Sequence, residues 1–393
     1  MLHSRWRVVD KLGFGGYSTT WLARDELHKR YVAVKVGISD TTSRHNREPE
    51  ILRAIQRSSS SSHKPSAPPR LDAATLLPTI LDAFDIRGPN GTHPCYALPL
   101  AQGNLREASF SRLFPIQVAR ALSANLVTAV AVIHSLGIVH GVKMPSTFDE
   151  LSVQDFRDKY GEPEKVPISR VDGKPLTANV PKYAVEPLYL GKKAQDFTLA
   201  DAQGLILSDF GEAFCPGTER RLGRECNAPL AKKAPEAVFE LDAPLTFSSD
   251  IWSLGTAIWE ILGMKFIFSE AETQDEISAQ QIDVLGATTF PESWREQWER
   301  QGDEDSHGAR AIPRRPTGER ETWPRLENAF EEFVQKYRRK REATGIFDEQ
   351  ETRAILELIR GMLRFRPEER LTADEVLMSE WMVKWALPEL ELD

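Results

Sequence analysis

Two glycines and a lysine near the start of the sequence have the types and spacing for binding phosphate groups. Gly13 and Gly15 lie in a short turn between segments rich in strand-forming residues. Glycine is favoured where backbone N–H groups must approach phosphate oxygens, because it has no Cβ. Residues 31–35 alternate as a strand and end in Lys35. A plain hairpin turn gives no reason for this lysine, and a dinucleotide-binding turn would lead into a helix instead. The arrangement therefore predicts a site for nucleotide phosphates.

An acidic partner for this lysine is available in the next segment. Residues 47–55 predict a helix that carries Glu48 and Glu50. Pro49 lies between them, and proline lacks an N–H and clashes with the preceding turn unless it lies in the first turn of a helix. We therefore expect a helix that is short or displaced, which leaves the pairing with Lys35 open.

A carboxylate with the right setting for a metal ion occurs much later in the chain. Residues 205–208 predict a buried strand, and Asp209 follows directly. Hard cations such as Mg²⁺ prefer oxygen ligands, and an acid at a strand end is well placed to supply one. The three cysteines are too few and too scattered for a Cys-x-x-Cys metal site or a disulfide framework.

Further segments must position these groups. An apolar stripe with helical spacing from Val118 to Ile133 predicts a buried helix. Residues 249–262 are apolar on nearly every side and predict a central helix, with Asp250 capping N–H groups at its start. We also expect strands at 76–85 and 95–100, a Ser/Pro-rich surface loop at 57–70, a helix near 356–363 and a closing segment at 366–377 with a capping box.

Composition limits the class of protein. The 393 residues are 41% hydrophobic and 27% charged, which is ordinary for one large domain or two lobes with separate cores. A net charge of −8 argues against direct nucleic-acid binding. The sequence shows no signal-peptide pattern, and we expect no segment as long and apolar as a membrane span. These features predict a cytoplasmic or nuclear protein.

The motifs, taken in order, resemble a eukaryotic protein kinase over essentially the whole chain. They are Gly13-Phe14-Gly15, Lys35, Asp209-Phe210-Gly211, Ala234-Pro235-Glu236, Asp250-Ile251-Trp252-Ser253 and Arg370. Residues 11–23 and 209–214, with an insertion at about 148–203, are similar to the SR-protein kinases, particularly their fungal relatives. The resemblance implies an α+β, two-lobed fold. The small β-rich N-lobe would be residues 1–101 and the larger helical C-lobe residues 102–393.

The resemblance also implies roles for single residues. Glu48 would pair with Lys35, because it precedes an Ile-Leu pair by three residues as the kinase glutamate does. Asp209 would bind Mg²⁺, and Glu236 would form a structural ion pair with Arg370. ATP would be held by Leu12, Gly13, Gly15, Lys35, Glu48, Leu98 and Leu100. The implied substrates are Ser or Thr in basic Arg/Ser-rich proteins, and the implied oligomeric state is a monomer.

The departure from the family falls in the catalytic loop. That loop runs His-x-Asp and then Asn five residues after the aspartate; the aspartate takes the substrate proton and the asparagine holds a second metal ion. Counting from His140 gives Val142 and Thr147 at these positions. Val142 can neither accept a proton nor orient a hydroxyl, so no residue of this chain is assigned as the catalytic base.

A second alignment explains both losses by one event. Related fungal sequences place a short loop with Asp and Asn between His-Gly and a Pro-Ser-Ser-Phe-Asp-like segment. Here residues 145–151, which match that segment, follow Gly141 almost at once. We favour this interpretation, in which about eight residues carrying both catalytic groups have been removed.

Three interpretations remain open at this point. The first is a working Ser/Thr kinase, which requires a base not found in the sequence. The second is a kinase-family protein that binds ATP and is inactive or severely impaired as written, or a scaffold if it binds no nucleotide. The third is a defective gene model, in which the real protein has the missing loop and is an active Ser/Thr kinase. Small-molecule kinases with a His-Gly-Asp loop are disfavoured, because they lack the motifs at 234–236 and 250–253.

A charged helical segment offers two further hypotheses. Glu327, Glu331 and Glu332 could dock basic peptides, or they could form a solvated helix face. The basic run 336–341 could be a nuclear-import patch, or it could balance these acids.

Overall fold

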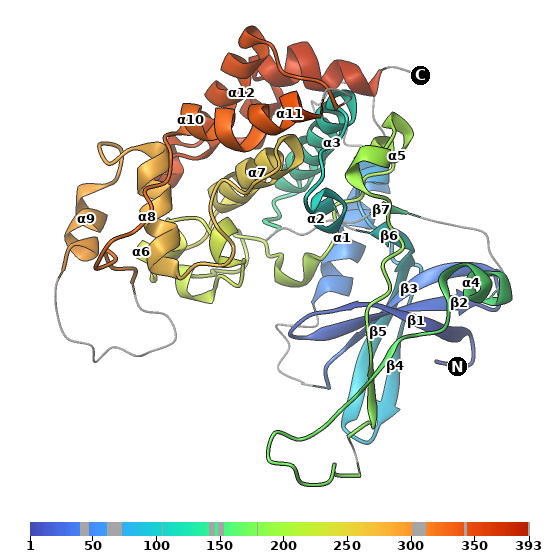
Figure 1. The fold of residues 1–393 in the computed structure, drawn as a ribbon. Coiled ribbons are helices and arrows are strands. Elements are labelled where there is room, and N and C mark those ends of the chain that lie inside the picture. The colour runs from blue at the N-terminus through green and yellow to red at the C-terminus, as the bar shows by residue number, and fades with distance from the viewer. Residues whose placement is uncertain are drawn as a thin grey trace. The chain divides into compact units, whose positions relative to one another are not determined.

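The computed structural model describes residues 1–39, 47–60, 73–103, 105–140, 146–147, 153–178, 180–300, 312–341 and 344–391. The chain divides into two compact units, drawn in Figure 1. The first unit comprises Met1–Ser61, Pro78–Asn104 and Pro145–Gly191, and the second Ser62–Leu77, Leu105–Met144 and Lys192–Asp393. The first is rich in strands and the second is helical, so the expected two-lobed α+β class is confirmed. The lobe boundary after residue 101 stays a prediction.

An antiparallel sheet forms the first unit. Its strands are ordered β1-β2-β3-β5-β4. Their bounds are β1 (Trp6–Phe14), β2 (Ser18–Asp25), β3 (Arg30–Gly37), β4 (Asp82–Gly88) and β5 (Gly91–Pro99). Side chains alternate across a strand, and β3 accordingly divides between two apolar clusters. Tyr31 and Ala33 belong to one cluster, and Val32 and Val34 to the other.

Two expectations about the segment between β3 and β5 are wrong in their limits. Helix α1 (Glu48–Ser60) continues into the predicted loop 57–70, whose residues 61–70 lie outside the described part of the chain. The predicted strand 76–85 begins only at Asp82, because Ala73–Leu76 form a 3-10 helix. Gly91 begins β5 directly after the turn that follows β4, and it adopts φ +121°, a conformation that favours glycine.

Smaller elements complete the first unit. They are β6 (Ala101–Gly103) paired with β7 (Ser146–Thr147), helix α4 (Val153–Tyr160), and β8 (Lys165–Pro167) paired with β9 (Tyr183–Val185). Most of them come from the predicted insertion, so this insertion contributes to the β-rich unit as well as separating two motifs.

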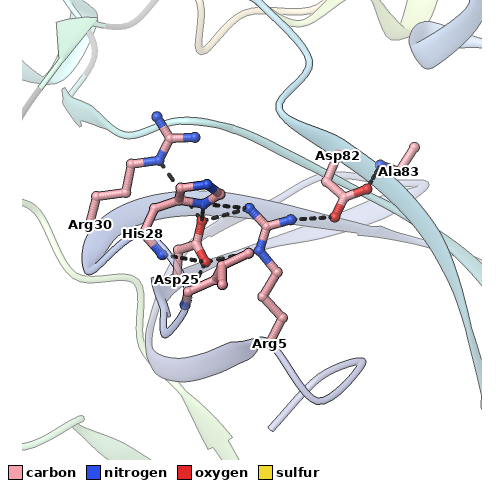
Figure 2. A network of polar contacts seen from close by, with 7 residues as sticks. Arg5, Asp25, His28, Arg30, Asp82 and Ala83 are labelled. Atoms are coloured by element: carbon pink, nitrogen blue, oxygen red, sulfur yellow. Dashed lines mark hydrogen bonds and ion pairs between the residues drawn. The ribbon is translucent and has the colours of Figure 1, made fainter.

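A buried carboxylate ties the N-terminal residues to the sheet (Figure 2). The Arg5 guanidinium donates to both oxygens of Asp25, at 2.9 and 2.7 Å, and also to Asp82 at 2.8 Å. The His28 ring lies 2.8 Å from the same carboxylate. Burial alone would raise the pKa of Asp25, but the hydrogen bonds from Arg5 and His28 hold it below its usual range.

Helices pack around two long apolar ones in the second unit. α3 (Ile116–Ser135) packs against α5, α7 and α13. α7 (Phe247–Leu262) is buried along most of its length, as predicted. The other helices are α2 (Leu105–Ser109), α5 (Leu199–Gln203), α6 (Glu236–Phe239), α8 (Gln274–Leu285), α9 (Glu292–Trp298), α10 (Leu326–Phe330), α11 (Lys336–Lys340), α12 (Glu349–Met362) and α13 (Ala373–Leu377).

Helix α3 corrects the expectation that no segment approaches a membrane span. By length and composition it could cross a membrane. However, 83% of its apolar window is buried inside the structure, which is the environment of a core helix in a folded domain.

The segment that leads to Asp209 has part of the predicted strand character. Leu205 and Leu207 are buried as expected, and Leu205 and Ser208 each form a single β-bridge, whereas residues 205–208 belong to none of the sheets among the described residues. The Leu207 N–H instead donates to the Leu76 carbonyl at 2.8 Å, at the end of the 3-10 helix.

The charged segment near residue 330 is only partly a solvated face. It is one helical stretch formed by α10, a π-helical turn (Glu331–Gln335) and α11. Glu327 pairs with Arg360 and Glu331 with Arg339. Arg338 is fully buried, and this burial lowers its pKa to about 9. The basic run is therefore not a uniformly exposed patch, which weakens the nuclear-import hypothesis.

Candidate active site

The structure brings Lys35 and Glu48 together in the first unit. Lys35 lies on β3 and Glu48 is the first residue of α1, and their Nζ and Oε2 atoms are 2.5 Å apart. Pro49 is the second residue of the helix, where the missing N–H removes no intrahelical hydrogen bond. The expected conflict between the proline and the ion pair therefore does not arise.

Both side chains of this ion pair are largely buried. The side chains of Lys35 and Glu48 are 17% and 5% exposed, respectively. A partly buried ammonium group that is paired with a carboxylate keeps a defined position. This arrangement can present a fixed positive charge to phosphate oxygens.

The glycine-rich turn has an accessible backbone. It connects β1 and β2, and the Gly15 N–H donates to the Ser18 carbonyl at 2.9 Å. A Cβ placed on Gly13, Gly15 or Gly16 would meet no atom within 4 Å in the described structure. The space above these backbones is open, which leaves room for the phosphate groups of a nucleoside triphosphate.

The remaining nucleotide-site candidates lie on the same sheet. Ala33 of β3 is paired in register with Leu98 of β5. Leu100 follows that strand and is 3% exposed. Leu12 is partly buried against the apolar cluster that contains Ala33 and Leu100. Leu12, Ala33 and Leu100 thus share one apolar cluster, and the role of Leu12, Leu98 and Leu100 in holding a base stays a prediction.

Asp209 has an unusual backbone in the second unit. Its φ and ψ are 68° and 61°, a left-handed conformation that is uncommon for residues other than glycine. The next residue, Phe210, begins a short 3-10 helix and is fully buried. Such conformations persist where the surroundings enforce them, and they are frequent at functional sites.

His140 is buried directly before the catalytic-loop segment. Its ring lies edge-on to Phe210, with centroids 4.4 Å apart. Burial lowers the pKa of His140 to about 4, so the ring is neutral at pH 7. Neither ring nitrogen makes a well-formed hydrogen bond to the described residues, although the nearby Ser208 backbone favours the protonated form. The geometry supports a structural role for this histidine.

Asp250 corrects a predicted role. It lies inside α7 and does not cap that helix, whose N-cap is Thr246. Its Oδ2 atom accepts the backbone N–H of His140 at 2.7 Å and lies 3.0 Å from Nε2 of His134. The carboxylate therefore fixes the backbone from which the catalytic-loop segment begins.

The catalytic-loop positions themselves are only partly described. Residues 141–145, including Val142, lie outside the described part of the chain. The backbone of Thr147 belongs to β7 and pairs with Ala101. In the described part of the chain, no group of three His, Cys, Asp or Glu side chains could hold a metal ion. The predicted lack of a base and of a second metal ligand at 142 and 147 remains a prediction.

Glu236 and Arg370 form the ion pair that the family resemblance implies. The two N–H···O distances are 2.8 and 2.6 Å, and both residues are buried. Arg370 also donates to the carbonyls of Ser248 and Phe365, at 2.8 and 2.9 Å. A buried pair with this many hydrogen bonds is costly to break.

Sequence reasoning missed the contacts of the insertion. Arg157 of α4 lies 3.3 Å from Asp10 of β1, and the two residues are 147 positions apart. No local pattern marks such a pair. Only the unusual burial of an acid in an edge strand points to it, and burial is a property of the fold.

The fold is two-lobed and contains a Lys–Glu pair, an open glycine turn, a left-handed Asp209 and a buried Glu–Arg pair. This combination is typical of the protein kinase class. Comparison with known proteins agrees. The family model described as "Protein kinase domain" matches residues 193–382. The chain is therefore similar to the protein kinases, and serine/threonine kinases of the SR-protein type are among its relatives.

Three relatives illustrate this. A serine/threonine protein kinase of Aspergillus fumigatus is 27% identical over 401 residues, covering 98% of this chain and 86% of that protein. Protein kinase dsk1 of Schizosaccharomyces pombe is 34% identical over 144 residues, covering 35% of this chain and 25% of that protein. Human SRSF protein kinase 3 is 36% identical over 100 residues, covering 25% of this chain and 16% of that protein.

Proposed function

We propose that this protein binds ATP with Mg²⁺ as a serine/threonine kinase of the SR-protein type and is inactive or severely impaired in phosphoryl transfer. One observation carries the proposal. The Lys35–Glu48 pair and the open glycine turn are intact, whereas the sequence supplies Val142 and Thr147 where the family has its base and its second metal ligand.

A few groups have separate roles in the proposed nucleotide site. Lys35 contacts phosphate oxygens and Glu48 holds its position. Backbone N–H groups of the turn at Gly13 and Gly15 approach the phosphates, and Leu12, Leu98 and Leu100 enclose the base. Asp209 supplies an oxygen ligand for Mg²⁺, which offsets phosphate charge when bound.

The proposed loss of activity follows from the missing groups. A general base typically contributes about 10² to 10⁴ in rate. Loss of the asparagine weakens the second metal site in addition. Positioning and charge stabilisation by the remaining groups still favour nucleotide binding, because binding does not require a base.

Purified full-length protein tests both halves of the proposal. Mg²⁺-ATP at about 100 times its Kd stabilises a protein by about 2.7 kcal/mol, so the unfolding midpoint should rise. Lys35→Met should abolish this rise. With radiolabelled ATP and an Arg/Ser peptide, transfer should stay at the level of an Asp209→Ala control. The absence of any nucleotide effect on the wild type would restrict the protein to a scaffold.

A second candidate function is an active kinase of Arg/Ser-rich proteins. The abrupt passage from Gly141 to the 145–151 segment favours it, because a loop missing only from the gene model would look the same. Sequencing the transcript across the codons for Gly141 and Val142 decides between the two. In either case we propose basic Arg/Ser-rich partners, a cytoplasmic or nuclear location, a monomer and no membrane or direct nucleic-acid partner.

A further inference from the structure

The insertion packs onto the strand that leads into the glycine-rich turn. Phe156 of α4 is 3% exposed and lies in a cluster with Val9, Leu22 and Tyr31. Its ring centroid is 5.3 Å from that of Tyr31. Leu190, from a later part of the insertion, belongs to the same cluster. Two separate parts of the insertion therefore pack on one face of the sheet.

Strand β1 is irregular at the places where the insertion touches it. Its register with β2 shifts between Val8 and Asp10 and again between Lys11 and Gly13. Bulges of this kind bend a strand and redirect the residues that come after them. The second shift lies directly before the glycine turn, so the course of β1 determines where that turn lies.

Hydrogen bonds from the insertion hold β1 beside each irregularity. Arg157 donates to the Val9 carbonyl, next to the first register shift. The Leu188 N–H donates to the Lys11 carbonyl at 2.7 Å, next to the second. β1 lies at one edge of the sheet, where carbonyl groups lack a neighbouring strand to pair with. The two bonds from the insertion supply donors to carbonyl groups of this strand.

An ion pair reinforces the first of these contacts. Asp10 is 5% exposed, and its Oδ2 atom lies 3.3 Å from Nη1 of Arg157. Its Oδ1 atom accepts the Lys11 N–H at 2.8 Å. A buried carboxylate that loses its cation pays a desolvation cost, so removal of Arg157 favours a different conformation of β1.

We propose that Arg157 is a positioning residue for the glycine-rich turn. Through the two irregular places in β1, the insertion holds the turn in the conformation that accepts phosphate groups. Leu12 and Ala33, two residues of the proposed base-binding surface, lie in or against the same cluster as Phe156, so the contact extends to that surface. The inference rests on the proposed binding of ATP and adds its control by the insertion.

The first test compares two arginines of the same insertion. Arg157→Met should weaken binding of a fluorescent ATP analogue with Mg²⁺ about tenfold, a coupling of the size usual between connected sites. Arg170→Met is the matched control, because Arg170 pairs with Asp172 on an exposed part of the insertion. The Arg170→Met variant should bind the ATP analogue with the affinity of the wild type. Binding is measured well below both unfolding midpoints, so a general loss of stability does not alter the result.

Amide hydrogen exchange provides a second measurement that needs no nucleotide. Arg157→Met should accelerate exchange at residues 13–18 and leave β4 and β5 unchanged, whereas Arg170→Met should do neither. Arg157→Lys, which keeps the charge but cannot reach both acceptors, should give a smaller effect in the same direction and serves if the Met variant does not fold. Unchanged exchange at residues 13–18 would overturn the inference. If the wild type binds no nucleotide but Arg157→Met still accelerates exchange at residues 13–18, only the proposed ATP binding would be overturned.

Discussion

The carboxylate of Asp250 accepts the backbone N–H of His140 at 2.7 Å, across 110 positions of sequence. The same oxygen lies 3.0 Å from the His134 ring. One buried acid on α7 therefore fixes the end of α3 and the first residue of the catalytic-loop segment. This scaffold is in place whether or not the loop that follows it contains a base.

Replacing Asp250 should destabilise the protein without a direct effect on nucleotide contacts. Asp250→Ala removes the acceptor of a buried N–H and the partner of His134, and we expect a loss of about 2 to 4 kcal/mol. Urea unfolding followed by tryptophan fluorescence measures it. Asp374→Ala, an exposed acid in the first turn of α13, is the control and should change stability by less than about 1 kcal/mol. Equal losses in the two variants would contradict this role.

Stability should fall as the pH drops from about 6.5 towards 4. The folded pKa of His140 is about 4, below its usual value of about 6.5, so the unfolded chain binds an extra proton in this window. The folded state is therefore penalised by about 2 kcal/mol at pH 5 and by almost nothing above pH 7.

His140→Phe should remove this part of the pH dependence, because phenylalanine can contact Phe210 but cannot take a proton. Urea midpoints at pH 7.5 and pH 5 provide the comparison. His3→Phe, at an exposed position, should retain the wild-type dependence. The interpretation fails if the two variants lose stability equally on acidification.

Gly15→Ala, which adds a single methyl group, should weaken nucleotide binding without changing the stability of the fold. Gly15→Ala meets no atom within 4 Å and involves no positive φ, so stability should be unchanged within about 1 kcal/mol. The methyl group would occupy the space that phosphate groups need, and affinity for a fluorescent ATP analogue should fall at least about tenfold. Gly217→Ala is an equally unobstructed control in the second unit. Unchanged affinity in Gly15→Ala would place the phosphates elsewhere.

The deletion and substitution interpretations of the catalytic loop predict different results for one variant. If single residues were exchanged, Val142→Asp combined with Thr147→Asn should restore phosphoryl transfer by about 10² or more. If the loop was shortened, these side chains replace residues outside the lost loop and transfer should stay at the background. We expect the second result. Insertion of an eight-residue family loop after Gly141 is then the variant that should restore activity.

Periodic and local patterns predicted much of the fold. The strands around the glycine turn, the strand that ends near Lys35 and the helices α3 and α7 follow from side-chain spacing, which depends only on near neighbours. The limits of α1 and β4 were wrong, because serines continue a helix that is already formed and Leu76 belongs to a 3-10 turn.

The remaining features depend on partners that are distant in sequence. The acceptor role of Asp250 requires the position of His140, and the burial of Asp10 requires Arg157. Neither partner carries a local signal, because polar residues at those positions fit solvent equally well. The same reason explains why the insertion's place on β1 was not predicted.

The Glu236–Arg370 pair has a consequence for the order of folding. Glu236 is translated long before Arg370, which lies near the end of the 393-residue chain. Until Arg370 emerges, the carboxylate must remain in water, so α6 cannot reach its final burial. Domains generally fold as units during synthesis. The helical unit of this protein can therefore complete its folding only after Arg370 has left the ribosome.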